Sequence, residues 1–243
     1  MQGLFMTGTD TDAGKTIATV LLTHCFMEHG VNIFPFKPVQ SGAEERDGQW
    51  VAPDVEQYKV LPGLQNERMF SCLYKKASSP HLAAEKEGAK IEVDLLKTDI
   101  QEQLKPNRLL LTEGAGGLFV PLNRQGYCIV DLIEELKFPV VIAAKASLGT
   151  INHTMLTVEA LKKRKVTIAG IILSSTVLED PEIEADNRLM IEKLSGVPVI
   201  GTIPYIENIE EQLADAAFRT KLTAKWNIEK IKEEINHGYT ATV

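Results

Sequence analysis

Short apolar runs alternate with longer amphipathic segments along most of this chain. The apolar runs lie at residues 4–6, 32–36, 109–112, 140–144, 168–173 and 197–200. Most of them lack the polar and apolar alternation of a half-exposed strand, so they predict strands buried on both faces, as in parallel sheets. Helical patterns lie at residues 17–27, 94–104, 151–162, 182–194 and 226–235. This order predicts an α/β fold, a doubly wound, mostly parallel sheet with helices on both faces.

The sequence contains no mark of a domain boundary. Its 243 residues include no internal repeat and no linker rich in Gly, Ser or Pro, and single α/β domains often reach this length. A hydrophobic fraction of 44% suffices for a sizeable core. We therefore expect residues 1–243 to form a single domain, with fraying past His237.

Composition and charge argue against several classes of function. The net charge is −7 and there is no basic tail, which disfavours nucleic-acid binding because such binding depends on phosphate neutralisation. No apolar run approaches the roughly 18 residues needed to cross a bilayer, and the N-terminus lacks a signal-peptide pattern. Cys25, Cys72 and Cys128 are widely spaced thiols without a Cys-x-x-Cys pair, as expected of a cytoplasmic protein.

The first apolar run leads into the strongest chemical signal. A turn-rich loop spans Gly8 to Gly14, and Gly14-Lys15-Thr16 then opens the first helical pattern. Glycine lets backbone N–H groups approach phosphate oxygens closely, and a helix N-terminus adds unpaired donors and partial positive charge. Lys15 would reach the β- and γ-phosphates, and the Thr16 hydroxyl would bind Mg²⁺. Five residues separate the two glycines, one more than the usual phosphate loop has, which leaves an ordinary Gly-rich turn as the alternative.

A carboxylate follows a later apolar run. In open parallel sheets, ligands bind outside the carboxyl ends of the strands. Glu113 directly follows the run at 109–112 and precedes Gly114-Ala115-Gly116-Gly117. This position is typical of the acidic element that completes Mg²⁺ coordination in phosphate-loop proteins. The alternative is a strand followed by a flexible turn, and the motif around Lys15 favours the functional interpretation.

A lysine follows the run at 32–36, where the sequence reads Lys37-Pro38-Val39-Gln40-Ser41-Gly42. Pro38 and Gly42 predict a turn after the strand. Lys37 and Ser41 could both point into one cleft, and a solvated surface lysine is the alternative.

The segments that remain are weaker when taken singly. The polar residues 43–53 predict a mobile loop, and Asp54 starts a helical run over residues 54–60, either as the helix N-cap or as a Mg²⁺ ligand. Residues 147–154 feed a helix N-terminus, which suits an anionic group as well as a routine connection. The other candidates are the helix start Ser79-Pro80-His81, the pair Ser174-Ser175 and the segment Ile203-Pro204-Tyr205-Ile206, which could border a nucleotide base.

Taken in order, these motifs resemble the dethiobiotin synthetases, a family with the phosphate-loop NTPase fold. The five-residue gap between Gly8 and Gly14 is usual in that family. Each matching piece is weak alone, but the ordered set is specific and runs from the first residues to about Tyr205. The pieces are Gly8-Thr9-Asp10-Thr11-Asp12-Ala13-Gly14-Lys15-Thr16, Lys37-Pro38-Val39-Gln40-Ser41-Gly42, Asp54, Ser79-Pro80-His81, Glu113-Gly114-Ala115-Gly116-Gly117, Leu148-Gly149-Thr150-Ile151-Asn152-His153 and Ile203-Pro204.

The resemblance implies an ATP- and Mg²⁺-dependent cyclo-ligase of biotin biosynthesis. One amine of 7,8-diaminononanoate (7,8-diaminopelargonate) would take up CO₂ to give a carbamate, whose oxygen attacks the γ-phosphate of ATP. The second amine would then close the ureido ring of the resulting carbamic–phosphoric anhydride. The products would be dethiobiotin, ADP and phosphate.

The same resemblance implies the site residues. Lys15 and Lys37 would be catalytic, and Thr16, Asp54 and Glu113 would hold Mg²⁺. The residues implied to bind the nucleotide are Asp12, Ala13, Gly14, Lys15, Thr16, Ile17, Asp54, Glu113, Gly114, Ala115, Gly116, Ser174, Ser175, Pro204, Tyr205 and Ile206. Those implied to bind the diamine substrate are Thr11, Ser41, Gly149, Thr150, Ile151 and Asn152.

The resemblance also implies a homodimer. In this family the segment from Gly149 to Asn152 comes from the partner subunit, so the active site would lie at the subunit interface. The other implied partners are small molecules, namely diaminononanoate, CO₂ and ATP, with neither nucleic acid nor a membrane, and the implied location is the cytoplasm.

Two positions depart from the family pattern. Asp12 stands where the family commonly has Glu, and Ser174-Ser175 stands where members often carry an Asn that reads the purine edge. We therefore expect weaker discrimination between ATP and other nucleoside triphosphates than an Asn-bearing relative shows.

Two rival functions use the same type of fold. Synthetases that act on corrin-ring acids usually continue into a glutaminase-like domain, for which 243 residues leave little room. ATP-driven partition switches typically carry a lysine early in the phosphate loop, where this chain has Asp10, and a basic amphipathic tail, where this chain mixes Lys with Glu. ATP turnover that requires the diamine and bicarbonate would distinguish the synthetase from such a switch.

Overall fold

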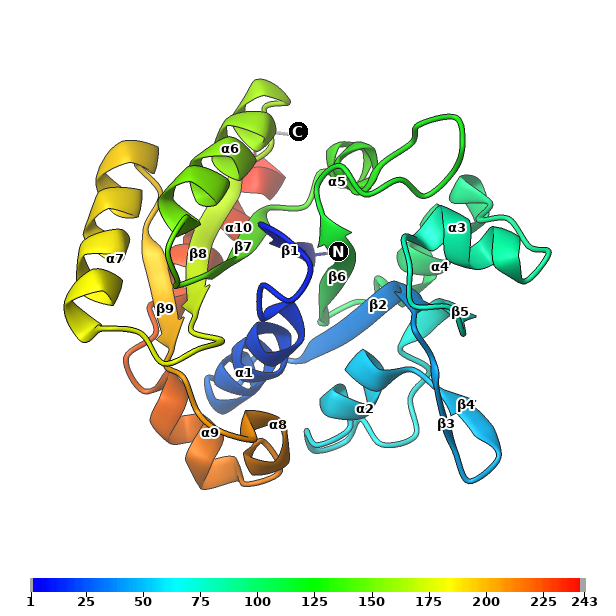
Figure 1. The fold of residues 1–243 in the computed structure, drawn as a ribbon, viewed down its shortest axis with the longest axis horizontal. Helices are drawn as coiled ribbons and strands as arrows, with labels where there is room; N and C mark the ends of the chain where they lie inside the picture. Colours follow the sequence, from blue (N-terminus) through cyan, green and yellow to red (C-terminus); the bar gives the residue numbers. More distant parts are fainter. Residues whose placement is uncertain (1, 241–243) are drawn as a thin grey trace.

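Seven strands form one sheet in the order β5-β2-β6-β1-β7-β8-β9 in the computed structural model, which describes residues 2–240 (Figure 1). Each pair of neighbouring strands is parallel. The prediction of an α/β fold with a mostly parallel sheet is therefore confirmed. The strands are β1 (Gln2–Gly8), β2 (Ile33–Ser41), β5 (Phe70–Tyr74), β6 (Leu109–Gly117), β7 (Val140–Lys145), β8 (Ile168–Ser174) and β9 (Val199–Ile203).

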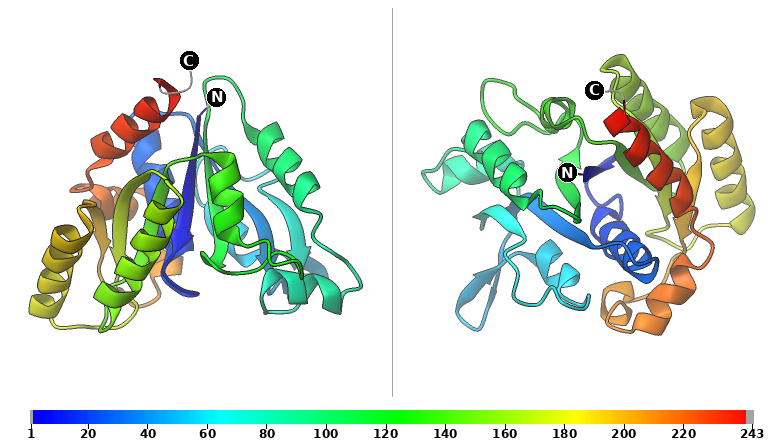
Figure 2. Two further views of the ribbon diagram at one scale, coloured as in Figure 1. Left: turned by 90° about the horizontal axis from the view of Figure 1, so that it is seen from above. Right: turned by 180° about the vertical axis from the view of Figure 1, so that it is seen from behind.

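Helices cover both faces of this sheet (Figure 2). On one face, α1 (Lys15–Glu28) packs on β1, β2 and β6, and α10 (Ile228–Thr240) packs on β1 and β8. On the opposite face, α4 (Val93–Gln103) packs on β2, α5 (Ile129–Leu136) on β6, and α6 (Thr150–Lys163) on β7 and β8. Right-handed crossovers between parallel strands distribute the helices in this way.

The other helices lie at the edges of the sheet and around its carboxyl ends. They are α2 (Pro53–Tyr58), α3 (Pro80–Lys86), α7 (Pro181–Ser195), α8 (Ile209–Gln212) and α9 (Ala216–Thr223).

The last helix, α10, runs past His237, where the sequence predicts fraying. The rest of that prediction falls on residues 241–243, outside the described residues. None of the helices between residues 2 and 240 has the length and apolar character needed to span a membrane.

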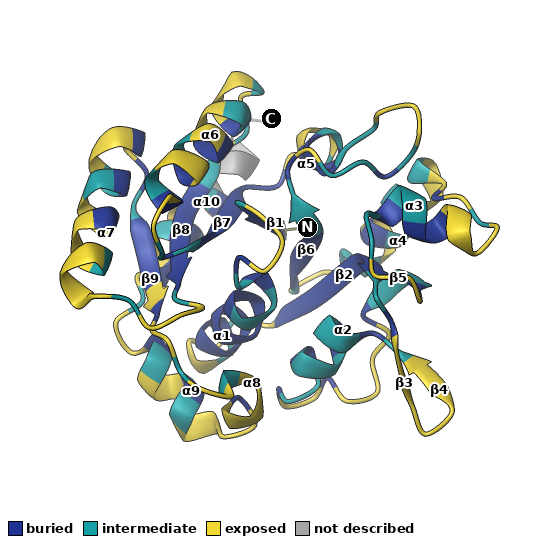
Figure 3. Cartoon of the chain, viewed as in Figure 1, coloured by how far each residue is buried: buried dark blue, intermediate teal, exposed yellow. Residues whose placement is uncertain are grey.

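The central strands form the core. Leu4, Phe5 and Met6 of β1 have no exposed area, and β7 is buried from Val140 to Ala144. Figure 3 shows that buried positions follow the strands, while the outer sides of α6 and α7 are exposed. Because helices cover both faces, these strands need no polar alternation, which is why they read as continuous apolar runs.

Two strands run further along the chain than the sequence predicts. β2 continues through Lys37 to Ser41, so the turn expected from Pro38 does not form. β6 continues through Glu113 to Gly117, so the glycines after Glu113 end a strand and do not form a flexible turn. Lys37 and Glu113 therefore lie inside strands.

The extra length of β2 comes from a change of partner. β2 pairs with β6 as far as Phe36 and Thr112, and from Lys37 onward it pairs with β5, a strand that the apolar pattern does not predict. The β2–β6 ladder thus ends one residue before Lys37 and Glu113, whose side chains are joined by a 2.7 Å contact between Lys37 Nζ and Glu113 Oε1. The separating strands leave space for polar side chains between their carboxyl ends.

Residues 43–53, which the sequence predicts to be a mobile loop, contain a short hairpin. β3 (Glu44–Arg46) pairs with β4 (Gln49–Val51) in antiparallel fashion. Asp47 and Gly48 connect them, and both have positive φ angles, 51° and 74°. An Asp-Gly pair with two positive φ angles makes the turn that matches the twist of a hairpin, and it is a recognised sequence signal for one.

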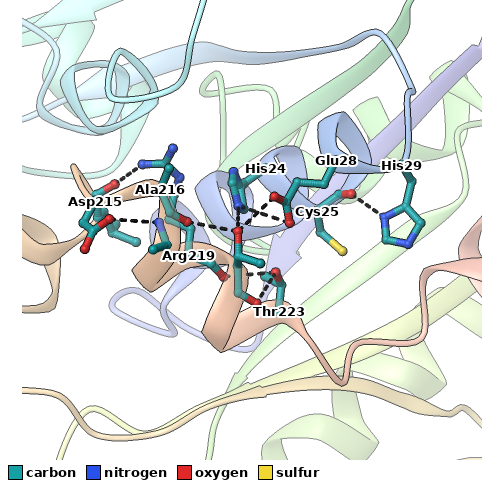
Figure 4. A network of polar contacts seen from close by, with 11 residues as sticks. His24, Cys25, Glu28, His29, Asp215, Ala216, Arg219 and Thr223 are labelled. Atoms are coloured by element: carbon teal, nitrogen blue, oxygen red, sulfur yellow. Dashed lines mark hydrogen bonds and ion pairs between the residues drawn. The ribbon is translucent and has the colours of Figure 1, made fainter.

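Polar contacts join the outer side of α1 to α9 (Figure 4). His24 is 6% exposed, and its Nε2 lies 3.0 Å from Thr220 Oγ1, which donates a hydrogen bond to Glu28 Oε1 at 2.9 Å. Burial lowers the pKa of His24, the charge of the buried Arg219 on α9 lowers it further, and Glu28 opposes the shift. The neutral imidazole is therefore the form that suits this contact.

We predict that the protein loses stability as the pH falls below the ordinary histidine pKa of about 6.5. Because the pKa of His24 is lowered in the folded state, the unfolded chain binds the proton more readily, and folding weakens until the pH passes below the folded-state pKa. Urea unfolding at about pH 7.5 and about pH 5.5 measures the difference. His24→Gln should reduce this difference in the free energy of unfolding. His153→Gln replaces an exposed histidine on α6 and should leave the difference unchanged. An equal pH dependence in wild type and His24→Gln would contradict the prediction.

Candidate active site

A cavity of about 550 Å³ opens at the carboxyl ends of the strands. Its walls come from the loop before α1, the end of β2, the β3–β4 hairpin, α2, the end of β6 and the segments after β8 and β9. This is the edge of a parallel sheet at which ligands are expected. The predicted site residues that line it are Thr11, Asp12, Gly14, Lys15, Thr16, Ile17, Lys37, Ser41, Asp54, Ala115, Gly116, Ser174, Ser175, Pro204, Tyr205 and Ile206.

The remaining predicted site residues lie elsewhere. Ala13, Glu113 and Gly114 are buried behind the cavity wall. The segment from Gly149 through Thr150 and Ile151 to Asn152 begins α6 and does not line this cavity. One chain therefore brings together the nucleotide and metal candidates but leaves the predicted substrate-carboxylate segment apart from them.

Backbone geometry shapes the loop between β1 and α1. Asp12 and Gly14 have positive φ angles of 57° and 79°, and Gly14 is the N-cap of α1. A Cβ added to Gly8 would lie 2.8 Å from the carbonyl oxygen of Asp10 and 2.9 Å from Lys15 Nζ. These atoms leave no space for a side chain, so the position requires glycine. The N–H groups in the first turn of a helix have no partner within it, so they can receive phosphate oxygens.

Lys15 folds back over this loop. Its Nζ donates a hydrogen bond to the carbonyl oxygen of Asp10 at 2.9 Å, and the residue is 7% exposed. Burial lowers the pKa of Lys15 to about 8, the charge of Lys37 adds to this effect, and Glu113 and Asp54 oppose it. Below that pH the ammonium form dominates and can pair with an anion in the cavity.

Glu113 is the centre of a buried polar cluster. It has no exposed area, and its Oε1 accepts hydrogen bonds from Lys37 Nζ at 2.7 Å and Thr16 Oγ1 at 3.1 Å. Lys37 Nζ also lies 2.6 Å from Asp54 Oδ2 and 3.3 Å from the carbonyl oxygen of Gly114. Residues from α1, β2, α2 and β6 thus converge on one charge cluster.

The charges of this cluster hold one another in place. Burial by itself would lower the pKa of Lys37, but the carboxylates of Asp54 and Glu113 raise it above its ordinary value. Burial would raise the pKa of Asp54, but the charge and hydrogen bond of Lys37 bring it below its ordinary value. The cluster therefore contains an ammonium and a carboxylate at neutral pH, as a buried ion pair requires.

Tyr58 is a further member of the site that the sequence prediction missed. Its ring is fully buried, and its hydroxyl donates a 2.6 Å hydrogen bond to Glu113 Oε2. Burial raises the pKa of Tyr58, and Glu113 adds to the shift, so the phenol keeps its proton and acts as a donor. Tyr58 lies four residues after Asp54, on the same side of α2, and this spacing was the available signal.

The oxygen atoms around Glu113 suit a magnesium ion. Mg²⁺ prefers oxygen ligands, and it is usually held by one or two carboxylates together with substrate phosphates and water. Thr16, Asp54 and Glu113 supply a hydroxyl and two carboxyl groups at the foot of the loop. Within residues 2–240 no group of three His, Cys, Asp or Glu side chains gathers into a metal cage, so phosphate and water would complete the coordination.

The far walls of the cavity hold residues without a predicted role. Glu44 and Arg46 of the hairpin line it and form a 2.7 Å ion pair. Gln57 Nε2 lies 3.4 Å from Glu210 Oε2, which connects α2 to α8 across the cavity. The Asp-Gly turn signal could have placed the hairpin, but no sequence pattern indicated the contact between α2 and α8.

The two serines at the end of β8 have different surroundings. Ser174 is 4% exposed and packs against Gly14, where an added Cβ would lie 2.7 Å from Ser174 Cβ. The Ser175 hydroxyl lines the cavity and donates a hydrogen bond to Glu184 Oε1. Both serines line the cavity, but Ser174 is packed against Gly14, so Ser175 is the one whose replacement can add a larger group to the cavity wall.

We predict that Tyr58→Phe lowers the free energy of unfolding by about 1–3 kcal/mol, because it leaves Glu113 Oε2 buried without its donor. Urea unfolding measures the change. Tyr205 is 43% exposed, and Tyr205→Phe removes the same type of group from the surface. Its free energy of unfolding should stay within about 0.5 kcal/mol of wild type. Equal effects of the two variants would count against the role given to the Tyr58 hydroxyl.

The sequence resembles known proteins along most of its length. A family model described as an AAA domain matches residues 2–212. The chain is 39% identical over 237 residues to the ATP-dependent dethiobiotin synthetase BioD of Halalkalibacterium halodurans, with 97% of this chain and 98% of the relative covered. It is 42% identical over 212 residues to the BioD of Anoxybacillus flavithermus, with 87% and 96% covered.

A solved structure shares the fold. The ParA family ATPase from Chlorobium tepidum TLS has a TM-score of 0.51 and 14% identity, with 98% of each chain covered. At that identity the similarity concerns the fold alone, whereas the similarity to the synthetases spans nearly their whole sequences. The chain belongs to the family of ATP-dependent dethiobiotin synthetases.

Proposed function

We propose that this protein is an ATP-dependent dethiobiotin synthetase, a cyclo-ligase of biotin biosynthesis. It converts 7,8-diaminononanoate, CO₂ and ATP into dethiobiotin, ADP and phosphate. The observation that carries the proposal is the convergence of Lys15, Lys37 and Asp54 on one cavity at the carboxyl ends of the strands, with the buried carboxylate of Glu113 in contact with Lys37. The names of the relatives supply the reaction.

The loop before α1 binds the triphosphate of ATP. Its backbone and the N-terminus of α1 receive the phosphate oxygens, and Lys15 exchanges its bond to the Asp10 carbonyl for the β- and γ-phosphates. Pro204, Tyr205 and Ile206 border the base together with Ser175. Thr16, Asp54 and Glu113 would hold Mg²⁺, which would offset the charge on the phosphate oxygens.

Lys37 makes the transfer step possible. A carbamate and a triphosphate are both anionic, so their approach costs electrostatic energy unless fixed cations offset it. Lys15 and Lys37 line the same cavity and supply those charges. Thr11 and Ser41, which also line the cavity, hold the diamine so that the carbamate oxygen lies in line with the γ-phosphate, and proximity provides much of the acceleration.

Ring closure follows from the same placement. Phosphorylation of the carbamate oxygen turns it into a leaving group. The second amine, held beside the carbonyl carbon by the first, attacks that carbon, forms the second C–N bond and expels phosphate. The chain needs no nucleophilic side chain for this step, because the reacting groups belong to one substrate molecule.

A homodimer completes the site in this proposal. The segment from Gly149 to Asn152 does not line the cavity of its own chain, and as a helix N-terminus it suits the distant carboxylate of the diamine. Leu148, beside this segment, is 92% exposed and Phe119 is 67% exposed, so both apolar side chains are accessible to a partner subunit. Sedimentation equilibrium that gave only a monomer at assay concentration would contradict this part of the proposal.

The proposal includes a single domain and a cytoplasmic location. One seven-stranded sheet joins strands from β1 to β9, which supports treating residues 1–243 as one nucleotide-binding domain. Cys25, Cys72 and Cys128 are free thiols, and ATP and reducing conditions both belong to the cytoplasm.

Product formation tests the proposal. The purified protein is incubated with 7,8-diaminononanoate, bicarbonate, Mg²⁺ and ATP, and mass spectrometry detects the cyclic urea. ATP turnover should require both the diamine and bicarbonate. Turnover that is independent of them, and that responds to DNA, protein or a membrane, would identify a switch of the partition type and contradict the proposal.

We predict that Lys37→Ala lowers kcat by about 100-fold or more while ATP still binds, because the charge of Lys37 is needed mainly when phosphoryl transfer begins. Steady-state rates and calorimetric ATP binding measure the two effects separately. Lys59→Ala, which removes a lysine that pairs with Glu56 outside the cavity, should keep the wild-type rate. Unchanged turnover in Lys37→Ala would remove Lys37 from the mechanism.

We predict that ATP, GTP and CTP support initial rates within about tenfold of one another, because Ser174 and Ser175 occupy the positions at the end of β8 where an amide would read the purine. Ser175→Asn introduces that amide at the cavity wall and should raise the preference for ATP. A strong preference for ATP in the wild type would show that other groups select the base.

A further inference from the structure

Lys37 occupies the position of a cation among the proposed metal ligands. Its Nζ lies 2.6 Å from Asp54 Oδ2 and 2.7 Å from Glu113 Oε1. Glu113 Oε1 also accepts the hydrogen bond from Thr16 Oγ1. The ammonium therefore uses the carboxylate oxygens that are also assigned to Mg²⁺.

Mg²⁺ and the Lys37 ammonium would compete for these two oxygens. Mg²⁺ binds oxygen at about 2.0–2.1 Å in near-octahedral geometry, so a metal between Asp54 and Glu113 would lie where Lys37 Nζ now lies. A metal beside the ammonium would meet strong repulsion, because the cluster is buried and the effective dielectric constant is low. Lys37 is 4% exposed, so water screens this repulsion only weakly.

The surroundings allow the ammonium to leave. Lys37 lines the cavity, and its long unbranched side chain can rotate toward that space. Glu113 would keep its place, because Tyr58 holds the other oxygen, Oε2, at 2.6 Å. The oxygen that exchanges partners is thus Oε1, and the carboxylate as a whole is anchored.

We propose that Lys37 is the resident counter-cation of the metal site and that Mg²⁺ displaces it. The metal takes over the carboxylates of Asp54 and Glu113, and Lys37 turns into the cavity, where the carbamate meets the γ-phosphate. Arrival of the metal with its nucleotide thereby releases the second cation that the transfer needs. This inference rests on the metal site of the proposed function, and it adds an order of events to it.

Metal binding without nucleotide provides the first test. Mn²⁺ is the probe, and its electron paramagnetic resonance signal reports the free ion. Lys37→Met removes the charge and keeps most of the side-chain volume, and it should bind Mn²⁺ at least about tenfold more tightly than the wild type. An equal or weaker affinity would overturn the proposal.

Lys15→Met is the matched control. It removes the same charge from the same cavity, but Lys15 Nζ bonds to the Asp10 carbonyl and not to either carboxylate. Its gain in Mn²⁺ affinity should be clearly smaller than that of Lys37→Met. An equal gain in both variants would mean that general electrostatics, and not direct competition, governs the site, and would also overturn the proposal.

A wild-type crystal structure with ADP and Mn²⁺ provides the second test, which does not depend on a variant that folds. The anomalous signal of the metal should lie at Asp54 and Glu113, with Lys37 Nζ moved out of contact with both carboxylates. A metal bound there with Lys37 still bridging the two would refute the exchange. Neither result bears on product formation, so the proposed reaction stands or falls separately.

Discussion

The buried contacts of Lys37 with Asp54 and Glu113 are the constraint on which the site depends. A charge taken out of water is costly unless an opposite charge and hydrogen bonds compensate it. Glu113 has no exposed area and gains that compensation from Lys37, Thr16 and Tyr58. Each donor comes from a different element, so the cluster also ties α1, β2 and α2 to the end of β6.

The sheet creates the space for this cluster. β2 leaves β6 after Phe36 and joins β5 at Lys37. If the β2–β6 ladder continued, backbone hydrogen bonds would hold these two strands together at the point where the side chains of Lys37 and Glu113 meet. The change of partner also explains why Lys37 is buried even though the sequence admits a solvated surface lysine.

The fold alone does not assign the chemistry. The ParA family ATPase shares the architecture at 14% identity, and folds of this kind support many reactions. The assignment comes from the side chains around the cavity and from the similarity to the synthetases along nearly the whole chain. Lys37 is informative here, because a second cation that lines the same cavity as Lys15 suits the proposed reaction between two anions.

Local patterns in the sequence were sufficient for the parallel sheet and the loop before α1. Apolar runs such as residues 4–6 predict buried strands because helices cover both faces, and Gly14-Lys15-Thr16 marks the start of α1 without any tertiary information. The β3–β4 hairpin was also within reach, because the Asp47-Gly48 pair is a local signal. Its prediction as a loop followed from the polar side chains around that pair.

Three features were decided only by the tertiary structure. The change of partner by β2 depends on β5, whose residues are half-buried and carry no clear apolar pattern. The bond from Tyr58 to Glu113 and the bridge from Lys37 to Asp54 connect residues distant in the chain or on different elements. The sequence by itself determined which polar residues follow the apolar runs and so lie near the carboxyl ends of the strands. The order of elements along the chain and the residue types in each loop are local features. Which oxygen faces which cation was decided by packing, since burial and neighbours from other elements set those contacts.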